Sequence, residues 1–207
     1  MNPMCVDVPP DPKVAAIARK WRVSEAEVLA RKKAVERSSL ANHWGGFAVK
    51  AGGTFFLAGK KSYGGRLWNL ADNDRWCNFS CKVKVVGPSL GGGTELGMIF
   101  FLNAKSLYRI EGMDFGNGRD ISYTVPGKQL GALVKALKSI ESLYEAREFF
   151  DKLIETAKQV IDIAKGEPSI VYRPIATAEL EAGIKWNIQG KIDILGVQGK
   201  HGYLDDL

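Results

Sequence analysis

Few residues of this chain have the types and spacing that catalysis requires. The two histidines, His43 and His201, lie far apart in the sequence, and neither belongs to a metal-ligand spacing, so a histidine general base has little support. Asp114, between two apolar residues, is the best candidate for a functional acid, although a turn-facing carboxylate is the plainer interpretation. We therefore expect a protein that is not an enzyme and that carries no metal and no cofactor.

A glycine–lysine segment at residues 59–62 resembles the end of a phosphate-binding loop. That motif needs a glycine, four residues and then Gly-Lys-Ser/Thr. Here five residues separate Gly53 from Gly59, and Lys61 stands where Ser or Thr is required. We interpret the segment as a hairpin turn.

The cysteines indicate a reduced protein. Cys77 and Cys81 fall on the same face of one predicted strand, about 13 Å apart, which exceeds the reach of a disulfide. With Cys5 the count is odd, which favours free thiols and synthesis in the cytosol. The first residues lack the pattern of a secretory signal. Export by a route without a signal stays open, and the compartment is not predicted.

Tryptophans and basic residues are the strongest candidates for a binding surface. Four of the five tryptophans fall in the β-rich part of the sequence, near strand ends or glycine turns, with lysines around them. Such residues can contact lipid headgroups or a ligand, or stack on single-stranded nucleic acid, or simply fill a core. The candidate ligand- or membrane-binding residues are Trp44, Lys60, Lys61, Arg66, Trp68, Trp76, Lys82 and Lys84.

The element that must position these residues is a sheet, and its clearest strand covers residues 178–195. Apolar or small residues occupy the even positions from Leu180 to Ile194, and polar residues or glycine occupy the odd ones. An unbroken strand of this length would reach roughly 50 Å. We therefore expect either a strand bent round a barrel at Gly183 and Gly190 or two shorter strands.

Apart from a short strand at 169–175, the rest of the predicted sheet precedes residue 126. Short strands broken by glycine pairs at 45–46, 52–53 and 64–65 are followed by an alternating strand at 76–86. Glycine turns at 87–93 lead to the apolar run 96–102, typical of a central strand covered on both faces. Residues 106–113 and 120–125 are further strand candidates. About six strands in sequence favour an antiparallel barrel or sandwich.

Two helical regions accompany the sheet. Residues 13–40 predict two helices, with a break at Arg22–Val23 and a capping box formed by Ser24 and Glu27. Residues 130–165 repeat apolar positions at spacings of three and four, which predicts a long amphipathic helix. We expect it to pack on the sheet, with homo-oligomerisation through this helix or a membrane-lying helix as alternatives.

The sequence thus predicts an α+β protein: a Gly-rich antiparallel β-barrel or sandwich, an N-terminal helical arm, and a long amphipathic helix before the last long strand. The expected division is an N-terminal lead and helical arm at 1–40, and a β domain at 41–207 that includes the helix. The tail from residue 196 is expected to be loosely held.

The net charge of +6 permits attraction to nucleic acid or to an anionic membrane surface. Lysines and arginines are spread along the chain rather than gathered in one block, so charge alone does not decide between them.

Residues 91–131 resemble the secreted VapA-type virulence-associated proteins. The shared features are Gly91, Gly93, Gly97, Phe100 and the Leu107-Tyr108-basic triplet, continued by residues 121–131. This chain departs from that family in lacking a signal peptide and in its additional helices. The resemblance implies a compact β-barrel without catalytic activity that is connected with host endosomal membranes.

We therefore expect a non-enzymatic protein that binds a lipid, a membrane surface or an apolar small ligand, with virulence or toxin action implied only by the resemblance. A nucleic-acid-binding protein that uses the basic N-terminal helices is the first alternative. A pore-forming β-toxin, in which residues 178–195 insert into the membrane, is the second.

Overall fold

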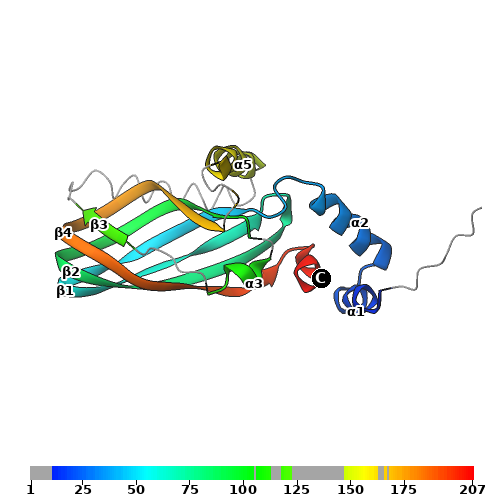
Figure 1. The fold of residues 1–207 in the computed structure, drawn as a ribbon, viewed down its shortest axis with the longest axis horizontal. Coiled ribbons are helices and arrows are strands. Elements are labelled where there is room, and N and C mark those ends of the chain that lie inside the picture. The colour runs from blue at the N-terminus through cyan, green and yellow to red at the C-terminus, as the bar shows by residue number, and fades with distance from the viewer. Residues whose placement is uncertain (1–10, 105, 113–117, 123–146, 163–165, 167) are drawn as a thin grey trace, which may run out of the picture.

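A computed structural model describes residues 11–104, 106–112, 118–122, 147–162, 166 and 168–207. These residues form an α+β fold around one antiparallel sheet in the order β1-β2-β4-β3 (Figure 1). Its strands are β1 (Trp44–Asn69), β2 (Asp72–Leu102), β3 (Gly118–Ser122) and β4 (Ser169–Gln198). The helices are α1 (Pro12–Trp21), α2 (Glu25–Glu36), α3 (Leu107–Ile110), α5 (Arg147–Ile161) and the 3₁₀ helix η2 (Gly202–Asp206).

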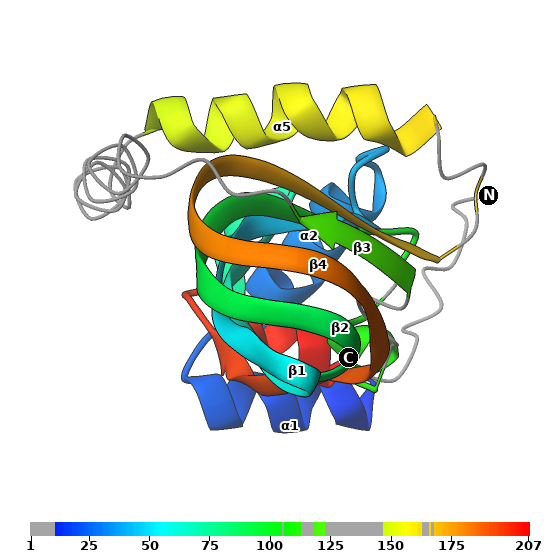
Figure 2. The same cartoon turned by 90° about the vertical axis from the view of Figure 1, so that its left-hand side faces the viewer.

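Each of the three long strands bends near its middle, so the sheet folds over and its two halves face each other (Figure 2). In β1 the bend coincides with a register shift between Phe56 and Ala58, and in β2 with Gly87, whose φ is 138°. The α+β class and the antiparallel sheet are confirmed. Closure into a barrel is not, because β1 and β3 form open edges within the described sheet.

Glycines allow the two halves of β1 to touch. A Cβ built on Gly46 would lie 1.8 Å from the carbonyl oxygen of Arg66, and one on Gly65 would lie 1.9 Å from that of Phe47. Only residues without a side chain permit this approach. The prediction that glycine pairs break this region into short strands is therefore wrong, since they lie inside one continuous strand.

The core lies between the two halves of the sheet. Phe79 and Phe101, from opposite halves of β2, pack edge to face with ring centroids 5.9 Å apart. Residues 96–102 are covered on both faces, as predicted. Ile99 and Phe101 point inward, while Met98 and its alternate neighbours contact the second apolar cluster on the outside. In β4 the predicted alternation is confirmed at 191–193, where Ile192 is buried between two exposed residues.

Helix α5 covers one outer part of the sheet (Figure 2). Leu153, Ala157 and Val160 are buried against β1 and β2. The predicted helix at 130–165 is confirmed for Arg147–Ile161, and its packing on the sheet is confirmed for the same residues. The rest of that range, apart from Asp162, lies outside the described residues.

The N-terminal helices pack on the C-terminal residues. As predicted, Ser24 caps α2 by accepting a hydrogen bond from the Glu27 N–H at 3.1 Å, and the two helices are separated at Arg22 and Val23. Arg22 follows α1 in the left-handed conformation. The side chains of Tyr203 and Leu204 in η2 are buried among α1 and α2. The expectation of a loosely held tail is wrong, because Tyr203 and Leu204 form a separate hydrophobic cluster with residues of α1 and α2.

Three further expectations differ from the structure. Residues 107–110 form the short helix α3 rather than a strand, because Leu107 and Ile110 on one helical face fill the inner core. Residues 59–62 belong to β1 and pair with β2, so they are not a hairpin turn. The glycine turns predicted at 87–93 are the bend of β2, which continues through them. The strand predicted at 120–125 is confirmed for residues 120–122, which belong to β3, and residues 123–125 lie outside the described residues.

Candidate functional site

Six of the eight candidate residues share one surface, which we call the outer face. It consists of the outward side of the second half of β1 and the paired first half of β2. The register places Lys60 opposite Lys84 and Trp68 opposite Trp76, and directly opposed side chains lie on the same face of a sheet. The outer face contains Lys60, Arg66, Trp68, Trp76, Lys82 and Lys84.

The other two candidates lie inside the fold. Trp44 is fully buried in the inner core, with the guanidinium carbon of Arg75 4.8 Å from its ring centroid. Lys61 is buried because its side chain points to the inner face, one position away from the exposed Lys60. Neither is available to a surface ligand in this conformation.

Arg66 and the two tryptophans form a stack at the end of the outer face nearest α5. The guanidinium carbon of Arg66 lies 3.8 Å from the ring centroid of Trp76 and 5.9 Å from that of Trp68. Its Nε donates to Asn78 Oδ1 at 3.2 Å. Trp68 packs on Phe47 beneath α5, with ring centroids 6.0 Å apart. This part of the outer face is therefore already engaged in packing.

Four exposed lysines occupy the rest of the outer face. Lys60 faces Lys84 across β1 and β2, and Lys82 faces Lys191 across β2 and β4. Like charges placed directly opposite each other destabilise a sheet. Within the described part of the chain, none of these four lysines forms an ion pair with an acidic side chain. Asp193, a described acidic residue near them on β4, pairs with Ser80 rather than with a lysine. We call Lys60, Lys82, Lys84 and Lys191 the lysine cluster.

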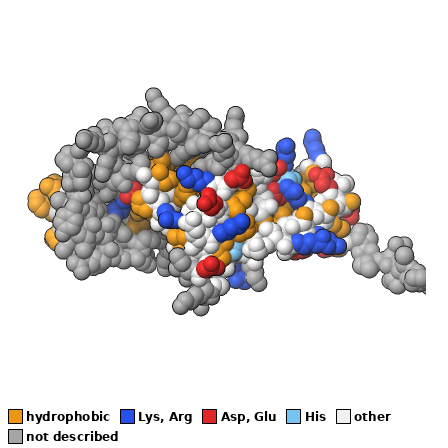
Figure 3. Space-filling model, turned by 90° about the horizontal axis from the view of Figure 1, so that it is seen from above, with side chains coloured by type: hydrophobic (Ala, Val, Ile, Leu, Met, Phe, Trp, Pro, Cys, Tyr) orange, Lys and Arg blue, Asp and Glu red, His pale blue; other side chains and the backbone are white. Residues whose placement is uncertain are grey.

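The lysine cluster leads to an exposed apolar end of the sheet, where the strands bend. Phe55, Phe56 and Leu57 follow one another there and are 70%, 64% and 69% exposed. Leu90 pairs with Phe55, and Val86 pairs with Ala58. The apolar tip, as we call it, comprises Phe55, Phe56, Leu57, Val86 and Leu90. Figure 3 shows hydrophobic side chains gathered at this end of the molecule, away from α1 and α2.

Sequence reasoning missed the apolar tip and Lys191. The run Phe55-Phe56-Leu57 reads as an ordinary apolar stretch, and only the bend with its register shift turns all three side chains outward. Alternation places Lys191 on the polar face of its strand, but it does not show that this residue lies opposite Lys82. That pairing depends on a register that links segments far apart in the chain.

Buried charges lie on the inner face. Lys50 Nζ and Glu95 Oε2 are 3.3 Å apart, and their residues face each other across β1 and β2. Both side chains are buried, as is Lys61. Breaking such a pair leaves a buried charge uncompensated, so we assign these residues to the fold.

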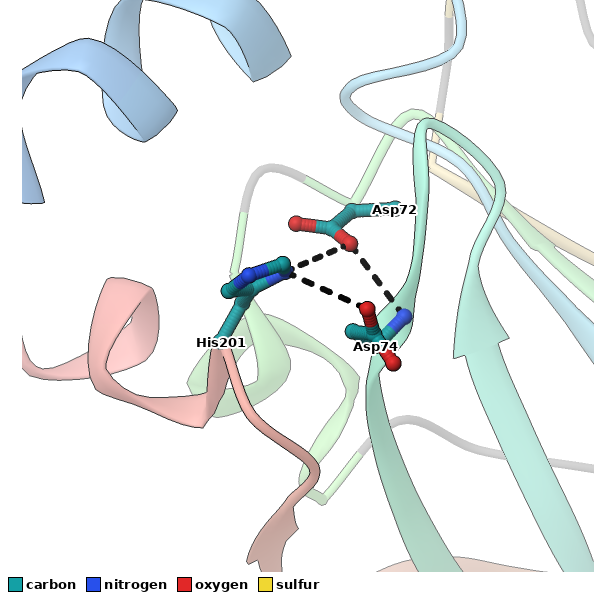
Figure 4. Close-up of side chains that lie close together, drawn as sticks. All are labelled: Asp72, Asp74 and His201. Atoms are coloured by element: carbon teal, nitrogen blue, oxygen red, sulfur yellow. Dashed lines mark hydrogen bonds and ion pairs between the residues drawn. The ribbon is translucent and has the colours of Figure 1, made fainter. Parts of the chain in front are cut away.

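A second polar cluster joins the β1–β2 turn to the C-terminal segment (Figure 4). Potential ligand atoms of Asp72, Asp74 and His201 all lie within 4.8 Å of one another. Arg31 of α2, however, donates to both carboxylate oxygens of Asp72, each at 2.9 Å, and His201 Nδ1 lies 2.9 Å from Asp72 Oδ1. A bidentate arginine occupies the carboxylate that a cation would need. The arrangement fastens α2 and the chain end to the sheet.

Buried Arg75 reinforces this connection. It forms a two-pronged salt bridge with Asp205 of η2, in which Nε donates to Oδ2 at 2.6 Å and Nη2 donates to Oδ1. Cys77, two residues further along β2, is a free buried thiol, and burial raises its pKa to about 12, with Asp205 adding to the effect. A thiol of this kind is not a nucleophile at neutral pH.

No family model, curated protein or solved structure matches this chain. Among the described residues no helix has the length and apolar character needed to cross a bilayer. The class that the fold defines is an α+β protein with one folded-over antiparallel sheet, a basic outer face and an apolar end.

Proposed function

We propose that this protein is a non-enzymatic peripheral membrane protein that binds anionic lipid surfaces through the lysine cluster. The observation that carries the proposal is the cross-strand register, which sets Lys60 directly opposite Lys84 and Lys82 directly opposite Lys191. An anionic surface would neutralise both repulsive pairs at once. A lysine close to such a surface contributes about 1 kcal/mol to binding.

A surface fits better than a small apolar ligand inside the sheet. The inner side of the sheet is filled by large side chains, including fully buried Trp44 and Phe101. The four lysines, by contrast, are exposed on three adjacent strands, so they present a broad array of charge rather than a pocket. The resemblance of residues 91–131 to VapA-type proteins points in the same direction.

Two alternative functions, nucleic-acid binding and pore formation, have less support from the contacts of the residues that they require. The nucleic-acid alternative relies on the basic residues of α1 and α2, where Arg31 is paired with Asp72 and Lys20 with Asp206. The pore-forming alternative requires residues 178–195 to leave the sheet, where they pair with β2 along their length and with β3 at residues 183–187.

The test compares wild type with the double variant Lys60→Gln/Lys84→Gln in co-sedimentation with phosphatidylcholine vesicles that contain or lack phosphatidylserine. Loss of two lysines should weaken binding by about 2 kcal/mol, roughly 30-fold. The same change should stabilise the fold by about 0.2–1 kcal/mol, because it removes a repulsive pair. A loss of binding in a more stable protein cannot come from misfolding.

The matched control is Lys33→Gln/Arg37→Gln, which removes the same charge from exposed positions in and just beyond α2. It should bind vesicles nearly as well as wild type. The proposal fails if wild type ignores the anionic vesicles, or if the control variant loses as much affinity as the sheet variant. Salt-sensitive binding to nucleic acid that only the control variant loses would favour the first alternative.

A further inference from the structure

We infer that the apolar tip enters the bilayer, so that the protein is held by insertion as well as by charge. This inference rests on the proposed membrane binding and specifies how it occurs. The partner of the apolar tip is an anionic bilayer, and the tip would lie in the headgroup region and the upper part of the acyl chains.

The exposure of the tip is unusual for its composition. Three consecutive large apolar residues, Phe55 to Leu57, are each about two-thirds exposed, and Leu90 on the neighbouring strand extends the same patch. Single exposed apolar residues are ordinary, but a contiguous group marks an interaction site. The rings of Phe55 and Phe56 pack edge to face, 4.5 Å apart, so they project as one unit.

The backbone at the tip is held in a costly conformation. Phe56 has a φ of 57°, a left-handed value that bulky residues rarely adopt. Beside it the register advances two residues on β1, from Phe56 to Ala58, and three on β2, so the extra residue lies on β2, opposite Leu57. A bulge of this kind redirects side chains away from the sheet. Glycine or asparagine would adopt this backbone more readily, so the phenylalanine at this position opposes the local backbone preference.

Charge decides which occupant fits the tip. Lys60 lies three residues beyond Leu57, and Lys84 lies two residues before Val86, so the cations follow the apolar residues directly on both strands. At about 3.3 Å per residue the lysines start roughly 7–10 Å behind the apolar residues. That separation matches an apolar element buried to a depth of about 5–10 Å with cations at the headgroups. A second copy of the chain would bring its own lysine cluster against this one.

The experiment places an environment-sensitive nitrobenzoxadiazole label at the tip. Leu57→Cys is labelled in a Cys5→Ser background, where the remaining thiols Cys77 and Cys81 are buried. On anionic vesicles the emission should shift to the blue and be quenched by lipids with nitroxide groups on the acyl chain. The matched control carries the label at Leu29→Cys, an exposed apolar position on α2, and should show neither effect.

A second variant separates insertion from charge. Phe55→Ser/Phe56→Asn removes the apolar pair and suits the backbone at residue 56. At about 0.5 M salt this variant should bind anionic vesicles at least about tenfold more weakly than wild type. Salt then screens the lysines, so burial of apolar side chains must supply the binding energy.

The outcomes distinguish this inference from the proposed function. Insertion is overturned if the protein binds vesicles but the emission of the label at residue 57 does not shift. It is also overturned if the Phe55→Ser/Phe56→Asn variant binds as tightly as wild type at high salt. Either result leaves charge-based binding in place. A complete lack of vesicle binding by wild type overturns both. Self-association of the protein through the tip, abolished by the same variant in the absence of lipid, would replace the bilayer with a second copy.

Discussion

Gly65→Ala adds one methyl group where the two halves of β1 meet. The new Cβ would lie 1.9 Å from the carbonyl oxygen of Phe47 and 3.0 Å from the Cα of Ala48. A carbon–oxygen contact normally needs about 3.3 Å, so the two strand segments must separate by more than 1 Å. Both obstacles are backbone atoms, and neither can move away by a change of rotamer.

The cost follows from that forced separation. Overpacking of a tight interior typically costs about 1–3 kcal/mol, and a backbone-to-backbone contact belongs at the upper end of that range. For a chain of this size each kcal/mol lowers the melting temperature by about 2–4 °C. We therefore expect Gly65→Ala to lower it by roughly 5–10 °C.

The neighbouring residue provides the control. A Cβ on Gly64 points to the other side of β1, where the nearest atom is the Phe79 carbonyl oxygen at 3.7 Å, an ordinary contact. Gly64→Ala should leave stability unchanged or raise it by up to about 1 kcal/mol, because alanine loses less backbone entropy on folding. Differential scanning calorimetry of the two variants decides the matter. Equal melting temperatures would refute the close approach of the strand halves.

Three further predictions concern the core and its titratable groups. Leu153→Ala, which truncates a fully buried side chain on the face of α5 that packs on the sheet, should lower the free energy of unfolding by about 2–5 kcal/mol in urea denaturation. Burial lowers the pKa of His43 below 6.5, and its Nδ1 accepts a hydrogen bond from the Asn103 N–H at 3.2 Å. The folded state therefore resists protonation, so stability should be full above pH 6.5 and should fall as the pH drops below it. His43→Asn should flatten that part of the stability profile. Ellman's reagent should leave Cys77 and Cys81 unmodified in the native protein and react with both in denaturant; rapid native reaction would contradict their burial.

The class of the fold was accessible from the sequence because local patterns report local structure. Period-two alternation identified the strand regions, and the Ser24–Glu27 spacing identified the start of α2. The length of the strands was not accessible. Glycines usually interrupt strands, and only the close approach of Gly46 to the Arg66 carbonyl shows why glycine is needed inside this one.

The candidate surface was accessible only in part. Alternation predicts that Lys82 and Lys84 lie on the solvent-exposed face of their strand, and the structure confirms this. The same rule applied to Lys60 and Lys61 cannot say which of two adjacent lysines points outward without the register of β1 on β2. The partnership of Lys82 with Lys191 joins positions 109 residues apart, counted as 191 minus 82. No local signal encodes such a contact.

The order of the strands has a consequence during synthesis. The β1–β2 hairpin is complete when residue 102 leaves the ribosome, but β4, which covers the other edge of β2, begins only at Ser169. For the time needed to translate the intervening segment, the open edge of β2, with its unpaired backbone N–H and C=O groups, is a template for pairing with other nascent chains. Production of this protein should therefore depend on rapid translation of the intervening segment or on chaperones that shield the hairpin until β4 is synthesised.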